Sequence, residues 1–230
     1  MRAWARRIGL LALALGGVAM AGCNPFGVFT LAAYLTGVDR EQKVAFRFPN
    51  DAQRVMVITV LPPSSPLDLG NLDREINENL SRRISLYFDS KNRRFKKEVI
   101  LPRKLHEFQG QNPDWQRMDV GDIARVLKAD HVVVINLRMF RLYEPGSSNS
   151  LYKGHAEGTL TVFRVTPEDC EPVMPEEAIV VDFPNADRPV PTTDVSLPRF
   201  RQAFINHFSE RISWYFVPHE TADEFARSTF

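Results

Sequence analysis

Two runs of apolar, mostly β-branched residues constrain the fold of this chain more than any other feature. The first extends from Arg54 to Leu61 and the second from His131 to Leu137. In each run, apolar residues occupy both faces of an extended chain, which is typical of a central strand that is covered on both sides. We therefore expect the two runs to form the centre of one sheet, with helices packed on at least one of its faces.

Segments with helical periodicity separate and follow these runs. Apolar residues recur every four positions between Asp68 and Asp89. A short helix is predicted over Val120–Lys128, with Asp119 as its N-cap and Asp122 in its first turn. The last predicted helix spans about Pro198–Phe216. Its apolar stripe consists of Phe200, Phe204, Phe208 and Ile212.

Shorter patterns predict four more strands. Alternation of apolar and polar residues indicates an edge strand over Lys43–Phe48 and a longer strand over Leu151–Val165. Short apolar runs indicate strands over Val99–Leu101 and Ala178–Phe183. A turn is expected over residues 144–150, and the proline- and acid-rich stretch before Ala178 is expected to be a loop.

The order of these elements predicts the fold class. The first five elements alternate between strand and helix, which implies two crossovers and three parallel strands. An antiparallel hairpin then extends the sheet. We therefore predict an α/β fold with a mixed sheet on which the C-terminal helix packs.

The N-terminus has the pattern of a bacterial secretion signal. A basic start precedes an apolar run from Ile8 to Met20 that is too short to span a bilayer. The run ends in Met20-Ala21-Gly22-Cys23, which resembles a bacterial lipobox. The resemblance implies cleavage before Cys23 and attachment of acyl chains, palmitate among them, to this cysteine.

The sequence thus divides into a signal peptide over residues 1–22, a lipid-anchored segment over 23–53, one domain over 54–218 and a tail over 219–230. After the signal, no apolar run reaches the roughly 18 residues that a transmembrane helix needs. We expect the lipid to hold the protein in a membrane. Asn24 is not the Asp that, by resemblance to enteric sorting, retains a lipoprotein in the inner membrane, so we expect the outer membrane, facing the periplasm.

Charge and cysteine content limit the partners and the chemistry. Removing residues 1–22 takes away three arginines and no acid, so the formal charge falls from +1 to −2. This small charge gives no reason to expect nucleic acid as a partner. With Cys23 acylated, Cys170 has no intramolecular disulfide partner, and its acidic neighbours disfavour the thiolate. An unreactive thiol is the simpler interpretation, and an intermolecular disulfide stays open.

Two segments carry opposite charges. Residues 82–104 contain nine lysines or arginines against two acids, and residues 166–194 contain eight acids against one arginine. The basic segment could bind phosphate head groups, lipopolysaccharide or an acidic protein. Alternatively, the two segments attract one another or are simply solvated. The residues that we predict to contact a partner are Arg93, Arg94, Lys96 and Lys97.

One pair of residues is a candidate for catalysis or metal binding. His155 and Glu157 lie two positions apart on a predicted strand, so they share one face and could form a general acid–base pair or part of a metal site. No third ligand follows from spacing, and a solvated strand face is the simpler interpretation. Common nucleotide-binding, nucleophile and zinc motifs are missing from the sequence. We predict no cofactor, no metal and no catalytic residue.

The order of elements resembles a family of bacterial lipoproteins that includes the curli secretion lipoprotein and the penicillin-binding-protein activator lipoprotein. Their shared domain is similar to the N-terminal domain of TolB. The resemblance rests on the strand Val55–Val60 with its following helix, on the basic stretch ending at Val99–Leu101, and on Ile123–Val134. In the last segment a short helix leads through Ala129-Asp130 into an apolar strand. Asn136 stands where the family usually has Gly, and prolines follow the first strand in place of an acidic-Asn loop.

The resemblance implies a periplasm-facing module that binds another envelope protein. We expect a non-catalytic module whose partner surface involves the basic segment, the turn at 144–150, or both. One alternative is a subunit of an oligomeric outer-membrane secretion pore, which requires long strands with an apolar face toward lipid. The predicted hairpin is short and carries Arg138, Arg141 and Glu157. An envelope hydrolase built on His155 is the other alternative, and the oligomeric state stays open.

Replacing Cys23 with Ala tests the lipid anchor. The acyl chains hold the protein because each buried CH₂ contributes about 0.8 kcal/mol. The Cys23→Ala variant should therefore move from the membrane fraction to the soluble fraction on cell fractionation. Membrane retention of this variant would contradict the interpretation of Met20–Cys23 as a lipobox.

Overall fold

The computed structural model describes residues 44–49, 52–62, 70–91, 97–184 and 188–219. The predicted signal peptide, Cys23 and most of the segment 23–53 lie outside these residues, as does the tail from residue 220 onward. Arg93, Arg94 and Lys96 also lie outside them. None of the described helices is both long enough and apolar enough to cross a bilayer.

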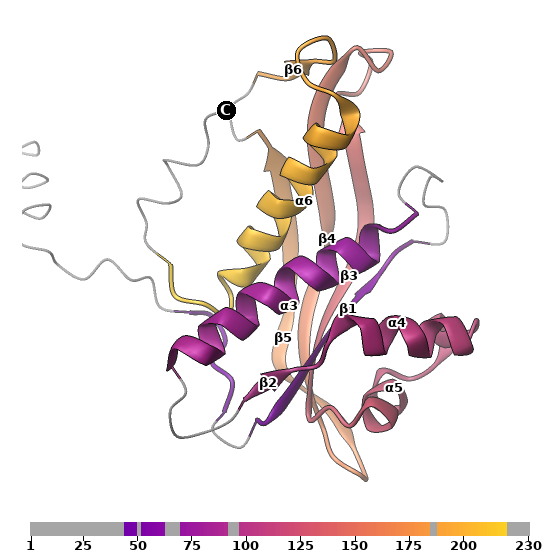
Figure 1. Ribbon diagram of the computed structural model, residues 1–230, viewed down its shortest axis with the longest axis vertical. Coiled ribbons are helices and arrows are strands. Elements are labelled where there is room, and N and C mark those ends of the chain that lie inside the picture. The colour runs from indigo at the N-terminus through magenta and orange to yellow at the C-terminus, as the bar shows by residue number, and fades with distance from the viewer. Residues whose placement is uncertain (1–43, 50–51, 63–69, 92–96, 185–187, 220–230) are drawn as a thin grey trace, which may run out of the picture. The chain divides into compact units, whose positions relative to one another are not determined.

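A mixed sheet of six strands forms the centre of the domain (Figure 1). Its strands are β1 (Arg54–Val60), β2 (Glu98–Val99), β3 (His131–Tyr143), β4 (Leu151–Val165), β5 (Cys170–Phe183) and β6 (Val190–Pro191). The order across the sheet is β2-β1-β3-β4-β5, and β6 pairs with β4. β1 is parallel to β2 and β3, whereas the pairs β3–β4 and β4–β5 are antiparallel. The predicted α/β fold with three parallel strands and an antiparallel extension is confirmed.

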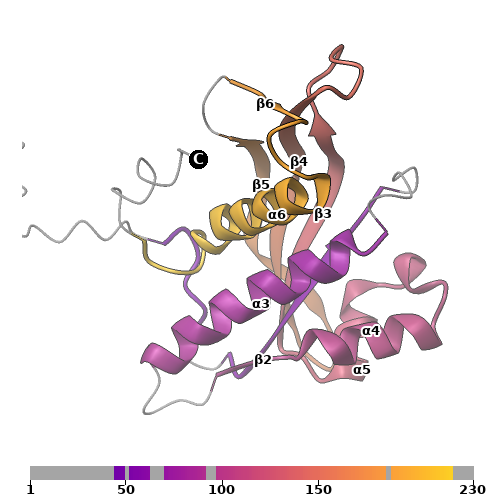
Figure 2. The ribbon, with the colours of Figure 1, turned by 45° about the horizontal axis from the view of Figure 1, so that its top comes forward.

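Four α-helices within the described residues pack on the sheet. They are α3 (Leu72–Lys91), α4 (Pro102–Gln111), α5 (Val120–Leu127) and α6 (Leu197–Ser213), and a short 3₁₀ helix, η2, covers Trp115–Arg117. Figures 1 and 2 show α3 and α6 together on one face of the sheet, with α4 and α5 on the other side of β1. The helix α3 makes the crossover from β1 to β2, and α4 and α5 make the crossover from β2 to β3.

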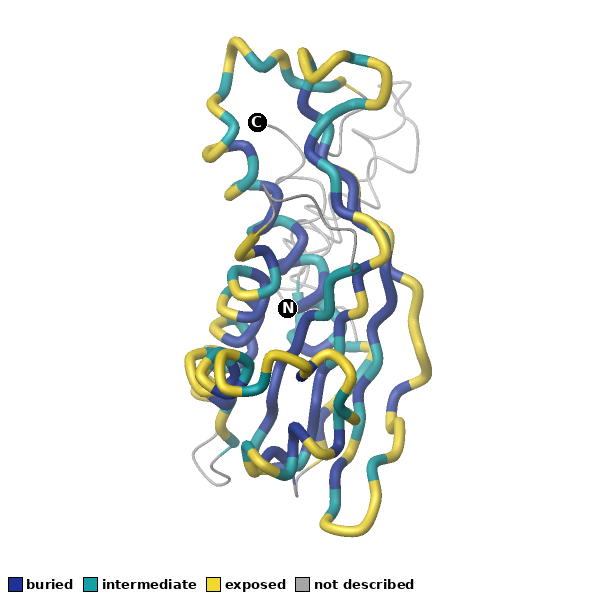
Figure 3. Tube along the Cα trace, turned by 90° about the vertical axis from the view of Figure 1, so that its right-hand side faces the viewer, coloured by how far each residue is buried: buried dark blue, intermediate teal, exposed yellow. Residues whose placement is uncertain are grey.

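The face under α3 and α6 holds the larger core. The predicted stripes of both helices are buried there. They consist of Leu72, Ile76, Leu80 and Ile84 on α3, and of Phe200, Phe204, Phe208 and Ile212 on α6. The ring of Phe140 on β3 stacks on Phe204 with 4.7 Å between ring centroids. The buried residues follow the middle of the sheet and the inner sides of the helices (Figure 3).

The opposite face of β1 and β3 packs against α4 and α5. Met56 and Ile58 on β1 and Val132 on β3 contact a second apolar cluster, whereas Val55 and Val57 point to the first. The helical members of this cluster include Leu105, Phe108, Trp115, Ile123 and Ala124. Helices therefore cover the apolar residues on both faces of β1 and β3, as the sequence predicted.

Two aspartates fix the start of α5 and the start of β3. Asp119 caps α5 as predicted, because its Oδ1 accepts a hydrogen bond from the backbone N–H of Gly121 at 2.7 Å. Asp130 Oδ2 accepts hydrogen bonds from the backbone N–H groups of Gln53 and Arg54, both at 2.9 Å. Burial alone would raise the pKa of Asp130, but these bonds and one from His131 hold it below the ordinary value. The Ala-Asp pair thus ties the entry of β1 to that of β3.

The structure corrects two predictions. Residues 44–49 form no strand: the backbone N–H of Phe46 donates to the carbonyl of Tyr215, and Phe48 packs against Phe88 and Phe216. Aromatic burial, rather than sheet pairing, therefore explains the alternation over Lys43–Phe48. Residues 170–177 are not a loop, because β5 begins at Cys170.

The two prolines of β5, Pro172 and Pro175, are tolerated because β5 is at the edge of the sheet. An edge strand needs hydrogen-bond donors toward one neighbour only. The β4–β5 register also shifts around Val162, opposite this part of β5. The sequence patterns did not predict α4, which begins directly at Pro102.

Close contact between β4 and α6 makes Gly154 sensitive to substitution. A Cβ atom on Gly154 would lie 2.7 Å from the ring of Phe204, which Phe140 and Phe183 hold in place. Gly154→Ala should lower the free energy of unfolding by about 1–3 kcal/mol. Gly110→Ala is the control, because nothing lies within 4 Å of its Cβ position. Because alanine favours a helix more than glycine does, Gly110→Ala should raise the free energy of unfolding by up to about 1 kcal/mol. Equal effects of both variants in urea denaturation would contradict the packing described.

Candidate functional site

The predicted pair His155 and Glu157 lies on one face of β4, and the fold adds Asp182 from β5. His155 is paired with Asp182 across the two strands. The imidazole Nδ1 lies 2.7 Å from Asp182 Oδ1, and Nε2 lies 2.7 Å from Glu157 Oε1. The histidine is nearly buried, whereas both carboxylates are half exposed.

In this Asp182–His155–Glu157 cluster, each ring nitrogen of His155 contacts one carboxylate, so the two contacts hold the imidazole between β4 and β5. Among the described residues no group of three His, Cys, Asp or Glu side chains could hold a metal ion. The cluster joins β4 to β5, and none of its residues lines the cavities beside Trp214, Leu86 or His106.

The other described histidines lie apart from this cluster. His131 is buried, with Nδ1 at 2.8 Å from Asp130 Oδ1. Burial, followed by Arg74, lowers the pKa of His106 on α4. His207 packs against Phe183 on the outer side of the α6 stripe. His219 stacks on Trp214 with 4.4 Å between ring centroids.

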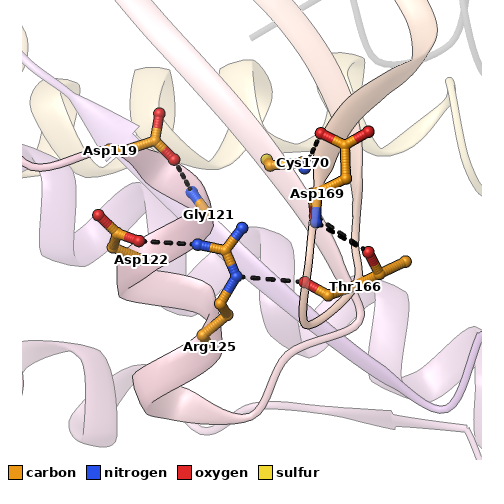
Figure 4. Close-up of polar contacts among 7 residues, drawn as sticks. All are labelled: Asp119, Gly121, Asp122, Arg125, Thr166, Asp169 and Cys170. Atoms are coloured by element: carbon orange, nitrogen blue, oxygen red, sulfur yellow. Dashed lines mark hydrogen bonds and ion pairs between the residues drawn. The ribbon is translucent and has the colours of Figure 1, made fainter.

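Cys170 lies where α5 meets the turn between β4 and β5 (Figure 4). Arg125 joins these elements: its Nε donates to the carbonyl of Thr166 at 3.2 Å, and its Nη1 donates to Asp122 at 2.7 Å. The turn is closed by Asp169, whose backbone N–H donates to Thr166 Oγ1 and whose Oδ1 accepts from the Cys170 N–H.

The surroundings of Cys170 agree with an unreactive thiol. Burial, followed by the charge of Asp119, raises the pKa of Cys170 above its ordinary value, which disfavours the thiolate. A Cβ atom on Gly121 would lie only 2.8 Å from Cys170 Cβ. The cysteine therefore packs tightly against the start of α5, and its contacts are structural.

The basic segment 82–104 is only partly described, and its members differ in role. Lys97 Nζ donates to the carbonyls of Phe48 and Pro49, at 3.0 and 2.7 Å. This lysine therefore anchors the chain that precedes β1, a function that the charge pattern did not reveal. Arg83 pairs with Glu210 on α6 at 3.6 Å, and Arg103 pairs with Glu107 on its own helix at 3.3 Å.

The ion pairs described for Arg83, Glu98 and Arg103 of the basic segment join them to residues outside 166–194. Within the acidic segment, Glu171 lies 3.9 Å from Arg164, and Asp182 contacts His155.

A groove lies between α3 and the chain that passes from β2 into α4. It has a volume of about 260 Å³ and is mainly apolar. Two exposed leucines flank it: Leu86 is 63% exposed and Leu101 is 60% exposed. The residues that line it are Glu78, Ser81, Arg82, Ser85, Leu86, Val99, Ile100, Leu101 and Pro102. We call it the α3–β2 groove. No sequence pattern pointed to it, because its walls come from two separate segments.

The sequence matches no known protein family, and no curated protein matches it. Solved structures similar to the chain include a PelC dodecamer from Paraburkholderia phytofirmans, at 10% identity and a TM-score of 0.40, over 77% of this chain and 96% of that one. Lipoprotein GNA1162 from Neisseria meningitidis matches at 7% identity and a TM-score of 0.38, over 70% and 98% of the two chains. A minor lipoprotein from Acinetobacter baumannii matches at 6% identity and a TM-score of 0.31, over 75% and 99%. Similarity at this level does not establish a family.

His207 gives the stability of the protein a dependence on pH. Burial, followed by Arg211 and Arg83, lowers its pKa from 6.5 to about 4. Between these values the unfolded chain binds more protons than the folded protein, so the free energy of unfolding rises with pH and then levels off above about 6.5. The free energy of unfolding rises by at most about 3 kcal/mol over this range. The increase is smaller in practice because His207 is only half buried and solvent screens its charge.

Urea denaturation across this pH range measures the effect. The His207→Phe variant should show a flatter profile, because an uncharged ring then packs against Phe183. A smaller slope from His106 should remain, since its pKa is also lowered. An unchanged slope in the variant would show that His207 does not carry the dependence.

Proposed function

We propose that this chain is a non-catalytic, lipid-anchored module of the cell envelope that binds another protein. The lipobox-like sequence ending at Cys23 supports the anchor, and Asn24 supports residence in the outer membrane, facing the periplasm. The observation that carries the binding function is the α3–β2 groove with its two exposed leucines.

The chemistry of the groove indicates the kind of partner. Exposed apolar residues gathered at one place, with polar residues around them, are typical of protein-binding surfaces. Leu86 and Leu101 can serve as the apolar anchors, and Arg82 also lines the groove. Glu78 lines it as well, and the exposed Arg103 pairs with Glu107 on α4. The sequence before β2 contributes Arg93, Arg94 and Lys96, for which we propose contacts with acidic residues of the partner. A partner segment with apolar anchors and acidic residues fits this surface.

Lys97 has a different place in this proposal. Its ammonium group already donates to two backbone carbonyls. It therefore supports the surface by holding the chain between residues 97 and 100 against the domain, and a partner contact is proposed for Arg93, Arg94 and Lys96.

The two alternative functions, a secretion pore and an envelope hydrolase, receive less support. The β3–β4 hairpin has strands of 13 and 15 residues, and β4 has the predicted bounds. However, one of its faces is covered by α6, and the other carries Arg141, His155 and Glu157, so it offers no free apolar face to lipid. A hydrolase lacks support because His155 lies outside the described cavities and both of its ring nitrogens contact carboxylates.

Site-specific crosslinking in cells tests the proposed surface. A photocrosslinking residue at Leu86 or Leu101 should capture the same partner, whereas one at Val126 should not. Val126 is the matched control because it is 61% exposed but lies on α5. Leu101→Asp should reduce capture from position 86 about tenfold, since it places a buried charge at the interface and repels an acidic partner.

The stability of the variants separates binding from folding. Substitutions at such exposed positions should change the free energy of unfolding by less than about 0.5 kcal/mol. Equal capture from positions 86 and 126, or full capture in a stable Leu101→Asp variant, would contradict the proposal. Capture should also weaken at high salt, because screening reduces the attraction between charged surfaces.

A further inference from the structure

The strand β2 leaves its outer edge open. In the part of the chain that the structure describes, β2 pairs with β1 alone. The backbone N–H groups of Glu98 and Ile100 donate to the carbonyls of Gln53 and Val55, at 2.7 and 2.8 Å. Backbone groups of successive strand residues point to opposite sides, so the N–H and C=O groups of Val99 face away from β1. Neither group has a hydrogen-bond partner among the described residues.

One face of α3 borders this outer edge. Its side chains line the α3–β2 groove opposite residues 99–102, and two of them, Ser81 and Ser85, are small. The side chain of Val99 packs toward the core under α3, whereas that of Ile100 belongs to the core on the other face. The backbone of Leu101 is still extended, so its side chain, two positions after Val99, faces α3 again.

We propose that the partner segment in the α3–β2 groove is extended and binds as an additional strand on the outer edge of β2. This inference rests on the proposed function and adds the conformation of the partner at the same surface. Backbone hydrogen bonds to Val99 contribute affinity, and every second side chain of the segment points toward α3. These side chains meet the exposed Leu86 and Leu101, so the segment carries apolar residues at alternate positions.

A second copy of this chain fits the edge less well. Antiparallel pairing of two β2 strands about Val99 would place Lys97 opposite Leu101 of the other copy. Each exposed leucine would then face a lysine that already donates to two backbone carbonyls. A register with Leu101 opposite Val99 would need the Leu101 carbonyl, which accepts from the Lys104 N–H at 2.9 Å. Another protein can present apolar residues at both positions, so we assign the edge to another protein.

Proline at position 99 tests strand addition. Val99→Pro removes the N–H that faces away from β1, and proline is tolerated on an edge strand at such a position. Capture of the partner by a photocrosslinking residue at position 86 should fall about tenfold, because the added strand loses a backbone donor. Val99→Ala is the matched control, since it shortens the side chain but keeps the N–H, and it should retain most of the capture. Urea denaturation checks that both variants fold.

A peptide probe tests the same interaction on the unaltered lipidated chain in detergent, and so does not depend on the folding of a variant. A labelled peptide in which leucine and threonine alternate should bind, as followed by fluorescence anisotropy. The same peptide with methylated backbone nitrogens keeps its side chains but has no N–H donors. It should bind at least about tenfold more weakly.

The outcomes separate this inference from the proposed function. Full capture by a folded Val99→Pro variant, equal binding of the two peptides, or no binding of either would overturn strand addition. If Leu101→Asp loses capture while Val99→Pro keeps it, the groove stays a binding surface and only the added strand is excluded. Full capture in a stable Leu101→Asp variant would instead contradict the proposed function. Crosslinking of position 86 to a second copy of the chain would assign the edge to self-association and also overturn the inference.

Discussion

β1 and β3 are buried on both faces, and the arrangement of the helices follows from this burial. A strand that is apolar on both faces must be covered twice, so one layer of helices cannot complete the domain. The layer of α3 and α6 covers one face with phenylalanine, leucine and isoleucine side chains, and α4 with α5 covers the other. The order of helices along the chain follows from this need, because each crossover between parallel strands supplies part of the cover.

Polar contacts then fix the register of the central strands. The carboxylate of Asp130 accepts two backbone hydrogen bonds from the start of β1 and contacts the His131 ring at the start of β3. Apolar packing alone would tolerate small shifts of one strand along the other. Because these bonds are directional, they hold Val55 opposite His131 and align the apolar residues of both strands.

The α3–β2 groove borders the edge of the sheet that β2 forms, where α3 meets the chain that leads into α4. Its walls combine apolar residues with Glu78 and Arg82, so charges of both signs lie beside the two exposed leucines.

Elements whose signal is local could be predicted from the sequence alone. Two-faced apolar runs predicted β1 and β3, i, i+4 stripes predicted α3 and α6, and Asp119 marked the start of α5, because periodicity and capping depend on neighbours in the chain. The shared face of His155 and Glu157 also followed from the two-residue period of a strand. Only the tertiary structure added Asp182, since strand register decides which residue of β5 lies opposite His155. The length of β5 also depends on the tertiary structure, because two prolines are tolerated only at the edge of the sheet. The same holds for Lys97, which donates to carbonyls almost fifty residues earlier in the chain. Contacts between distant segments depend on packing and register, and neither is encoded in the local pattern.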